Sequence, residues 1–166
     1  DAGNERGAHR PARPPAPSVE AVTAAELAAA MTSANSPLIL DLDTSLAFRD
    51  GHIPGAWWGV RARLARDLQH LPAGDDIFVT SADGAIAPYA APEIAALRPG
   101  ATVRVLTGGT AAWRADGRAT EPGTANLLGP HDDVQYKPYD NAGGVEAAMR
   151  AYLSWETALV GQIERD

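Results

Sequence analysis

Cysteine is absent from the sequence. This absence excludes disulfide bonds, thiolate metal ligands and thiol nucleophiles together, whatever the redox compartment. Long apolar runs are absent as well, since none approaches the ~20 residues that a membrane-spanning helix requires. With 45% hydrophobic and 21% charged residues, the 166-residue chain is predicted to be soluble and globular, with no membrane as a partner.

Positive charge is scarce. The sequence has 14 Lys and Arg against 21 Asp and Glu, which gives a net charge of -7, and its cations do not cluster. Such a chain repels phosphate backbones, so nucleic acid is not an expected partner. The length suits one ordinary domain with one sizeable hydrophobic core, together with tails.

Residues 1–18 are polar, basic and rich in proline, and they end in the run Arg10-Pro-Ala-Arg-Pro-Pro-Ala-Pro-Ser18. Such a segment cannot hold a helix and has little apolar surface to bury, so we predict a linker or tail. The first residue is Asp, and no apolar signal-peptide core follows, which suggests a fragment or a trimmed start. Because no export signal is visible, we take the bacterial cytoplasm as the default location.

Three short apolar runs, at residues 37–41, 76–80 and 102–106, have the composition of buried parallel strands. A helical pattern of crossover length, residues 85–97, joins the second run to the third. Strand, helix and strand with short loops predict an α/β domain with a parallel sheet. We expect Pro92 to kink or restart the helix, because proline removes an N–H and clashes with the preceding turn.

Two further helices are predicted at the ends of this unit. Thr23 and Glu26 form a capping-box pattern before a short helix at residues 24–32. Residues 145–163 carry an apolar stripe at helical spacing, which predicts a long amphipathic helix that packs on the domain or on a neighbour. The expected organisation is therefore a linker at 1–18, a domain at 19–123, and a loop plus C-terminal helix at 124–166.

Ligands in an open parallel sheet collect at the carboxyl ends of the strands. Three loops qualify here: residues 41–56, 81–86 and 107–113. The loop at 81–86 leads straight into the predicted helix, so unpaired backbone N–H groups should point into its curve. It is the natural candidate for a binding or catalytic site.

Three segments carry a resemblance to a known family. Phe48-Arg-Asp-Gly-His-Ile-Pro-Gly-Ala56, the strand, loop and helix around Ser81, and Leu106-Thr-Gly-Gly-Thr-Ala-Ala-Trp-Arg-Ala-Asp-Gly117 resemble the three signatures of a rhodanese-homology domain, in order and spacing. The resemblance covers roughly residues 24–123. Its motif residues outside the 81–86 loop are Gly51, His52, Ile53, Pro54, Gly55, Gly108, Gly109 and Trp113.

The resemblance implies a three-layer α/β/α sandwich around a five-stranded parallel sheet. It also implies sulfurtransferase chemistry, in which sulfane sulfur from a donor such as thiosulfate passes through a cysteine persulfide to a thiophilic acceptor. In the family that cysteine opens the loop after the second long strand, often with Arg beside it. Helix N-terminus, loop amides and cations all stabilise a thiolate.

This chain departs from the family at the chemical centre. Ser81 stands at the cysteine position, and the loop contains no Arg and one acid, Asp83. A serine hydroxyl is too weak an acid to ionise without a base and cannot form a persulfide. Asp83 would oppose an anionic substrate. Gly84 matches the family's loop glycine, so we expect the curve to persist without its function. The complete active-site-like loop is Ser81, Ala82, Asp83, Gly84, Ala85 and Ile86.

These features favour a catalytically silent module, structural or regulatory, of a larger thiosulfate sulfurtransferase, with other rhodanese domains of the same parent chain as partners. The alternative is a free-standing module that binds a small anion or a protein partner at the 81–86 loop. An active sulfurtransferase ranks last. A serine hydrolase is disfavoured because the Gly-x-Ser-x-Gly motif is absent. No catalytic residue and no cofactor are predicted.

The remaining polar candidates have structural explanations. We expect His52 to tie down the turn around it, because a lone histidine without a visible partner seldom carries catalysis. His131, Asp132 and Asp133 predict a solvated acidic loop, and no metal site is predicted. The other interpretations are a turn cap for Asp41 or Asp43, a helix-end cation for His70, and apolar packing for Trp57, Trp58 and Trp113.

Overall fold

The computed structural model describes residues 14–134, 146, 149–150 and 153–154. Its strands are β1 (Ala21–Val22), β2 (Leu38–Asp41), β3 (Trp57–Trp58), β4 (Asp76–Thr80) and β5 (Thr102–Leu106). Its helices are α1 (Ala24–Met31), α2 (Ser45–Asp50), α3 (Leu64–Asp67), α4 (Ala87–Leu97) and α5 (Gly109–Ala115). Two short 3₁₀ helices, η1 (Arg61–Arg63) and η2 (Leu68–His70), flank α3.

The five strands form one sheet in the order β1-β5-β4-β2-β3, and every neighbouring pair is parallel. The predicted α/β fold with a five-stranded parallel sheet is confirmed. The two outer strands, β1 and β3, have two residues each. Neither strand coincides with an apolar run of strand length, so the sequence pattern did not predict them.

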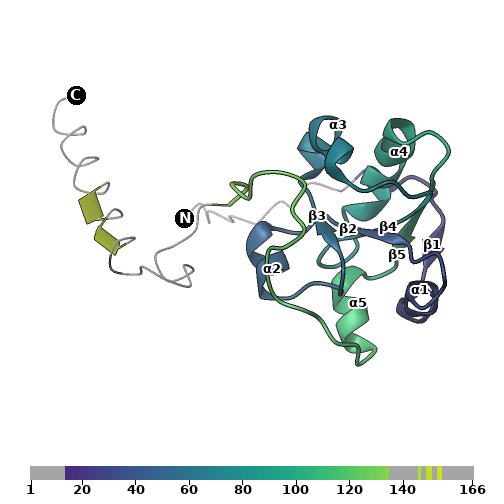
Figure 1. The fold of residues 1–166 in the computed structure, drawn as a ribbon, viewed down its shortest axis with the longest axis horizontal. Helices are drawn as coiled ribbons and strands as arrows, with labels where there is room; N and C mark the ends of the chain where they lie inside the picture. The colour runs from purple at the N-terminus through teal and green to yellow at the C-terminus, as the bar shows by residue number, and fades with distance from the viewer. Residues whose placement is uncertain (1–13, 135–145, 147–148, 151–152, 155–166) are drawn as a thin grey trace, which may run out of the picture.

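Alternate side chains of the strands enter two separate cores. Leu40, Val79 and Val105 are paired across β2, β4 and β5 and lie in one core with α3 and α4. Their neighbours Ile39 and Phe78 enter a second core with α1, α2 and α5. Figure 1 shows α3 and α4 on one side of the sheet and α1 and α5 on the other. The layers therefore follow from the two-residue period of the strands.

Helix α4 runs from residue 87 to residue 97 without interruption and contains Pro92. The restart expected at Pro92 does not occur. Pro92 lies on the exposed side of the helix, whereas Ala91 and Ile94 are buried against the sheet. Packing of that buried face outweighs the loss of one backbone hydrogen bond. The predicted capping box of the first helix is confirmed, with the side chains of Thr23 and Glu26 bonded to each other's backbone N–H.

A segment that we call the strap, residues 119–134, follows α5 and covers the outer edge of β3. Trp58 donates its backbone N–H to the carbonyl of Asn126 (2.8 Å) and accepts from Leu128 (2.9 Å). The side chain of Leu128 is buried in the core with α3. Pairing by the strap removes an unpaired sheet edge, which otherwise invites association.

The predicted long helix at 145–163 falls largely outside the described residues. Those that are described, 146, 149–150 and 153–154, are helical. Its expected packing on the domain or on a neighbour also falls outside the described residues. Within the described part of the chain, no helix combines the length and the apolar character needed to cross a membrane.

Candidate functional site

The 81–86 loop lies where β4 ends, and it packs against the glycine pair that begins α5. A Cβ placed on Gly109 would lie 2.0 Å from the carbonyl oxygen of Ser81 and 2.4 Å from the backbone nitrogen of Gly84. A Cβ on Gly84 would lie 2.9 Å from the nitrogen of Gly109. Both glycines have positive φ, 76° at Gly84 and 62° at Gly109. Glycine is therefore required at both positions for the two backbones to meet.

The first turn of α5 holds this loop by hydrogen bonds. Thr110 donates its backbone N–H to the carbonyl of Ser81, and Ala111 donates to the carbonyl of Ala82, both at 2.9 Å. The first N–H groups of a helix have no partner within the helix, so the loop carbonyls satisfy them. The tight curve expected from Gly84 is thus present. The motif at residues 106–117, which includes the first turn of α5, holds it in place.

Ser81 is buried inside the curve. Its relative exposure is 2%, and its hydroxyl oxygen has no hydrogen-bond partner. A serine nucleophile needs an adjacent base to remove its proton, and the described residues place none within bonding distance of this oxygen. A buried hydroxyl without a partner also costs free energy. The position therefore provides neither a thiolate nor an activated alkoxide.

Asp83 supplies the loop with its own anion. Its Oδ1 accepts a hydrogen bond from the backbone N–H of Ala85 at 2.9 Å, so one of the loop amides is already engaged. No Lys or Arg lies within residues 81–86 to offset this carboxylate. Amides and cations that converge on an anion are the basis of anion binding at a helix N-terminus. Here both contributions are reduced.

A buried carboxylate lies behind the loop, at the end of β2. The side chain of Asp41 is bonded to the backbone N–H of Asp43 (2.9 Å) and to the hydroxyl of Thr110 (3.4 Å). The Thr110 hydroxyl also lies 3.2 Å from that of Thr80. Burial raises the pKa of Asp41 to about 6, and the nearby charge of Asp43 adds to the increase. Asp41 caps the turn, as expected for one of this pair of acids, but its link to Thr110 carried no sequence signal.

His52 is enclosed by the domain. Its ring stacks on Phe48 with centroids 3.7 Å apart, and its Nδ1 lies 2.7 Å from the carbonyl oxygen of Phe48. Its Nε2 lies 3.4 Å from Oε1 of Glu121, which also accepts the backbone N–H of Gly55. These contacts support the expected role of His52 in holding the turn. Glu121, which sequence reasoning missed, joins the strap to that turn.

The other sequence candidates lie elsewhere. Trp58 and Trp113 are buried in the core with α1, as expected from apolar packing. His70, predicted as a helix-end cation, closes η2 and has its Nδ1 2.8 Å from the carbonyl oxygen of Leu128. Its ring therefore fastens the strap.

The predicted acidic loop at residues 131–133 is exposed at residues 131 and 132, and it is also anchored to the domain. Asp132 forms an ion pair with Arg63, and Asp133 accepts the backbone N–H of Ser45 at 2.9 Å. These contacts place the end of the strap against η1 and the first turn of α2, which local sequence does not encode. No group of side chains in the described part of the chain is arranged to hold a metal ion.

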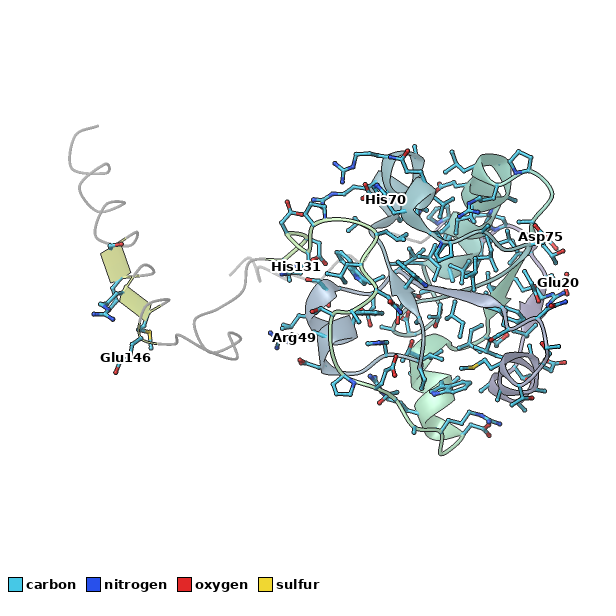
Figure 2. All side chains as sticks on the ribbon, viewed as in Figure 1. Glu20, Arg49, His70, Asp75, His131 and Glu146 are labelled. Atoms are coloured by element: carbon cyan, nitrogen blue, oxygen red, sulfur yellow. The ribbon has the colours of Figure 1, made fainter. Side chains whose placement is uncertain are left out.

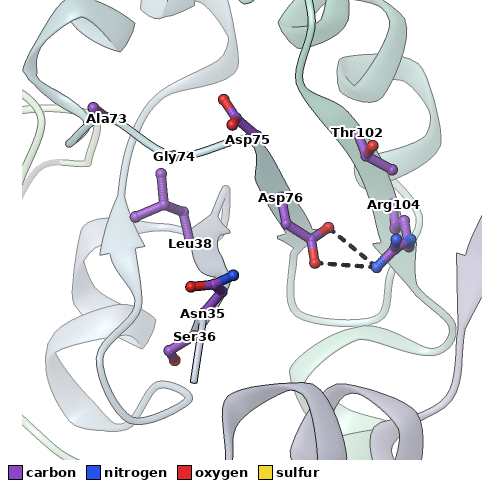
Figure 3. A pocket seen from close by; sticks show the side chains of 9 residues that line it. All are labelled: Asn35, Ser36, Leu38, Ala73, Gly74, Asp75, Asp76, Thr102 and Arg104. Carbon is purple, nitrogen blue, oxygen red and sulfur yellow. Dashed lines mark hydrogen bonds and ion pairs between the residues drawn. The ribbon is translucent and has the colours of Figure 1, made fainter. Parts of the chain in front are cut away.

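A pocket of about 640 Å³ lies at the opposite edge of the sheet, at the amino ends of β2, β4 and β5 (Figure 3). Its polar wall is the ion pair of Asp76 with Arg104, which also pairs with Glu20. Figure 2 shows Asp75 and Glu20 on this side of the molecule, with Arg49 and His131 on the other. The pocket is thus separate from the Ser81 loop.

An open parallel sheet covered by helices on both faces, with a tight loop at its carboxyl edge, defines an α/β domain of the type that binds ligands at that edge. The model of the rhodanese-like domain family matches residues 23–116. The chain therefore belongs to the rhodanese-like family. None of the curated proteins matches it significantly.

Solved structures agree with this assignment. A thiosulfate sulfurtransferase from Pseudomonas aeruginosa is 34% identical, with a TM-score of 0.80, over 98% of this chain and 30% of that chain. The Alr3790 protein from Anabaena sp. is 28% identical, with a TM-score of 0.54, over 61% of this chain and 82% of that one. The BH2092 protein from Bacillus halodurans is 25% identical, with a TM-score of 0.55, over 70% and 84% of the respective chains. This chain thus spans less than a third of the length of the Pseudomonas enzyme.

Proposed function

We propose that this chain is a catalytically silent rhodanese-like domain, residues 19–123 with the strap, that serves as a structural or regulatory module of a larger thiosulfate sulfurtransferase. The observation that carries the proposal is the state of the 81–86 loop. Its tight backbone curve is formed around Gly84 and Gly109, while Ser81 occupies the position of the family's cysteine. Sulfane sulfur transfer through a persulfide requires a cysteine thiol, and Ser81 provides none.

The surroundings of Ser81 also support the absence of catalysis, in addition to the serine at the cysteine position. Asp83 adds a negative charge to the loop, and its side chain accepts a hydrogen bond from the backbone N–H of Ala85. An anionic sulfur donor would meet a carboxylate where the family commonly places a cation. Loss of both the nucleophile and the cationic environment is consistent with a site that has lost its function as a unit.

The likeness to one part of a longer enzyme supports the role of a module. The Pseudomonas thiosulfate sulfurtransferase is 34% identical over nearly all of this chain, which corresponds to 30% of that protein. We infer that the parent of this chain has further rhodanese domains and that at least one of them has an intact cysteine loop. These domains are the proposed partners.

The test is a thiosulfate:cyanide sulfurtransferase assay with thiocyanate as the product. The isolated chain should form no thiocyanate above a blank, whereas the full-length parent should be active. A variant of the parent with Ser81→Ala should retain that activity, since another domain carries it. Thiocyanate formation by the isolated chain, or loss of activity in the Ser81→Ala parent, would overturn the proposal.

A titration of the same chain with sulfate, thiosulfate and phosphate distinguishes a catalytically silent domain that binds no anion from an anion-binding module. The backbone amide NMR shifts of residues 82–86 report directly on the curve. We expect no movement at millimolar concentrations, because Asp83 opposes the anion. Saturable movement would favour the free-standing anion-binding module instead.

A further inference from the structure

The strap is fastened to the turn at residues 51–55 by a buried histidine. His52 donates its backbone N–H to the carbonyl oxygen of Glu121 (3.0 Å) and accepts the backbone N–H of Glu121 (2.9 Å). His52 is only 4% exposed, and its Nε2 lies 3.4 Å from Oε1 of Glu121. The family match ends at residue 116, so Glu121 lies outside the matched segment.

The contacts of the His52 ring determine where its protons lie. Its Nδ1 is 2.7 Å from the carbonyl oxygen of Phe48, and a carbonyl oxygen can only accept, so Nδ1 carries a proton. A neutral imidazole has one N–H, which leaves Nε2 as an acceptor. Oε1 of Glu121 is also an acceptor, because it receives the backbone N–H of Gly55 at 2.7 Å. These two acceptors, 3.4 Å apart, attract each other only when a further proton is present.

That further proton belongs on the imidazole rather than on the carboxyl group. The side chain of Glu121 is 47% exposed, so water solvates its charged form, and a glutamic acid is ordinarily a stronger acid than an imidazolium. The His52 ring stacks on Phe48 beside the last turn of α2, and both an aromatic face and a helix C-terminus favour a cation. The geometry therefore describes an imidazolium paired with a carboxylate.

The other charges around His52 also favour a cation. Burial raises the pKa of Asp41, at the end of β2, and a charge on His52 opposes that increase. Arg114 of α5 donates a hydrogen bond to the backbone of the same turn. Arg49 and Asp50 of α2 neutralise each other as an ion pair. With Asp41 and the strap carboxylate ionised, these groups carry one excess negative charge, which an imidazolium balances.

We propose that His52 and Glu121 form a pH-sensitive latch, an imidazolium–carboxylate pair that holds the beginning of the strap and weakens as the imidazole loses its proton. Histidine is the side chain whose charge ordinarily changes between pH 5 and 8. Above that range Nε2 faces the carboxylate as a second acceptor, so the attraction is lost. The far end of the strap has no such dependence, because Asp132 pairs there with Arg63, which stays charged. The strap should therefore loosen at one end only. This inference does not depend on the proposed function.

The first test observes the protons of His52 directly, by nitrogen-15 NMR of the histidine rings. At pH 5.5 both ring nitrogens of His52 should be protonated, and at pH 8.5 only Nδ1 should remain so. Glu121→Gln should lower the pH at which Nε2 loses its proton. His70 is the control and should not change, because its Nδ1 lies against another strap carbonyl (2.8 Å), whereas no carboxylate of the described residues is within ion-pair distance of its ring. A neutral His52 at pH 5.5, or a proton left on Nε2 at pH 8.5, would overturn the inference.

The second test measures the latch by its effect on stability. Urea denaturation of the native chain, His52→Gln, Glu121→Gln and the double variant gives the coupling between the two side chains. We expect this coupling to be at least fivefold in the unfolding equilibrium constant at pH 5.5 and less than twofold at pH 8.5. A coupling that is equal at both pH values would show a purely structural contact and refute the latch.

Two further measurements keep this result independent of misfolding. Asp132→Asn is the matched control, because Arg63 lowers the pKa of Asp132 and their ion pair stays charged throughout this range. Its effect on stability should be the same at pH 5.5 and pH 8.5. If His52→Gln does not fold, the native chain is compared with Glu121→Gln alone. The stability difference between these two proteins should shrink as pH rises, and a constant difference would contradict the latch.

Discussion

The carbonyl oxygen of Ser81 lies only 2.0 Å from the position that a Cβ on Gly109 would occupy. Two segments almost thirty residues apart in the sequence therefore share one backbone-to-backbone contact, and the loop shape depends on it. The contact persists in a chain whose loop has no cysteine. Shape and chemistry at this edge of the sheet are separable, and the following predictions test each of them.

Replacing Gly109 by alanine should destabilise the domain by more than about 3 kcal/mol, because the methyl group meets backbone atoms and the positive φ adds strain. Gly117 is the matched control: its φ is 74°, yet nothing lies within 4 Å of a Cβ there. Gly117→Ala should cost only about 1 kcal/mol, from backbone strain. Urea denaturation measures both, and similar losses would contradict the close contact.

Ser81→Ala should leave stability unchanged or raise it by about 1 kcal/mol, since it removes a buried hydroxyl that has no partner. Thr110→Val is the contrasting variant, because its hydroxyl bridges Asp41 and Thr80. That change should destabilise the domain by about 1–2 kcal/mol. Thermal and chemical denaturation of both variants decide the point. A clear loss of stability in Ser81→Ala would mean that its hydroxyl has a partner in solution.

Ser81→Cys should restore the nucleophile without restoring the enzyme. The loop would still lack cations, and Asp83 would disfavour both the thiolate and an anionic donor. We expect thiocyanate formation at least about 100-fold below that of an intact rhodanese loop, the scale on which one stabilising electrostatic contact acts. Adding Asp83→Arg should increase the rate. Robust turnover by the single variant would show that the cations matter little.

The stability of the domain should depend on the buried carboxyl of Asp41. Burial raises its pKa from 3.8 to about 6 in the folded state, so folding is favoured when the group is protonated. This contribution is full below about pH 4 and is lost as pH rises towards 6, by an amount of about 3 kcal/mol.

The measurement compares the native chain with Asp41→Asn, which stays neutral at every pH. Relative to the native chain, the variant should become more stable as pH rises from 4 to 7, by up to about 3 kcal/mol. Measuring the difference removes the opposite effect of Asp67, Glu93 and Asp132, whose pKa values arginine partners lower. Parallel pH profiles for the two proteins would contradict a raised pKa at Asp41.

Local signals in the sequence determined much of this protein. The apolar runs at 37–41, 76–80 and 102–106 became β2, β4 and β5, and Thr23 with Glu26 began α1 as a capping box. The position of Ser81 between a strand and a helix was also readable. These features depend on side-chain period, capping and turn chemistry within a few residues, which a linear sequence displays directly.

Tertiary structure decided the remainder. It paired β1 and β3, which are too short for a periodic signal, and it kept α4 continuous through Pro92. It also brought Glu121 to Gly55 across 66 residues and buried Asp41 against Thr110. Such contacts arise from burial and from hydrogen bonding between distant segments, whose free energy exists only once the sheet has assembled. The sequence thus determined the three long strands, α1, α4 and the residue at the loop, whereas packing determined the partners of these elements and the protonation of Asp41.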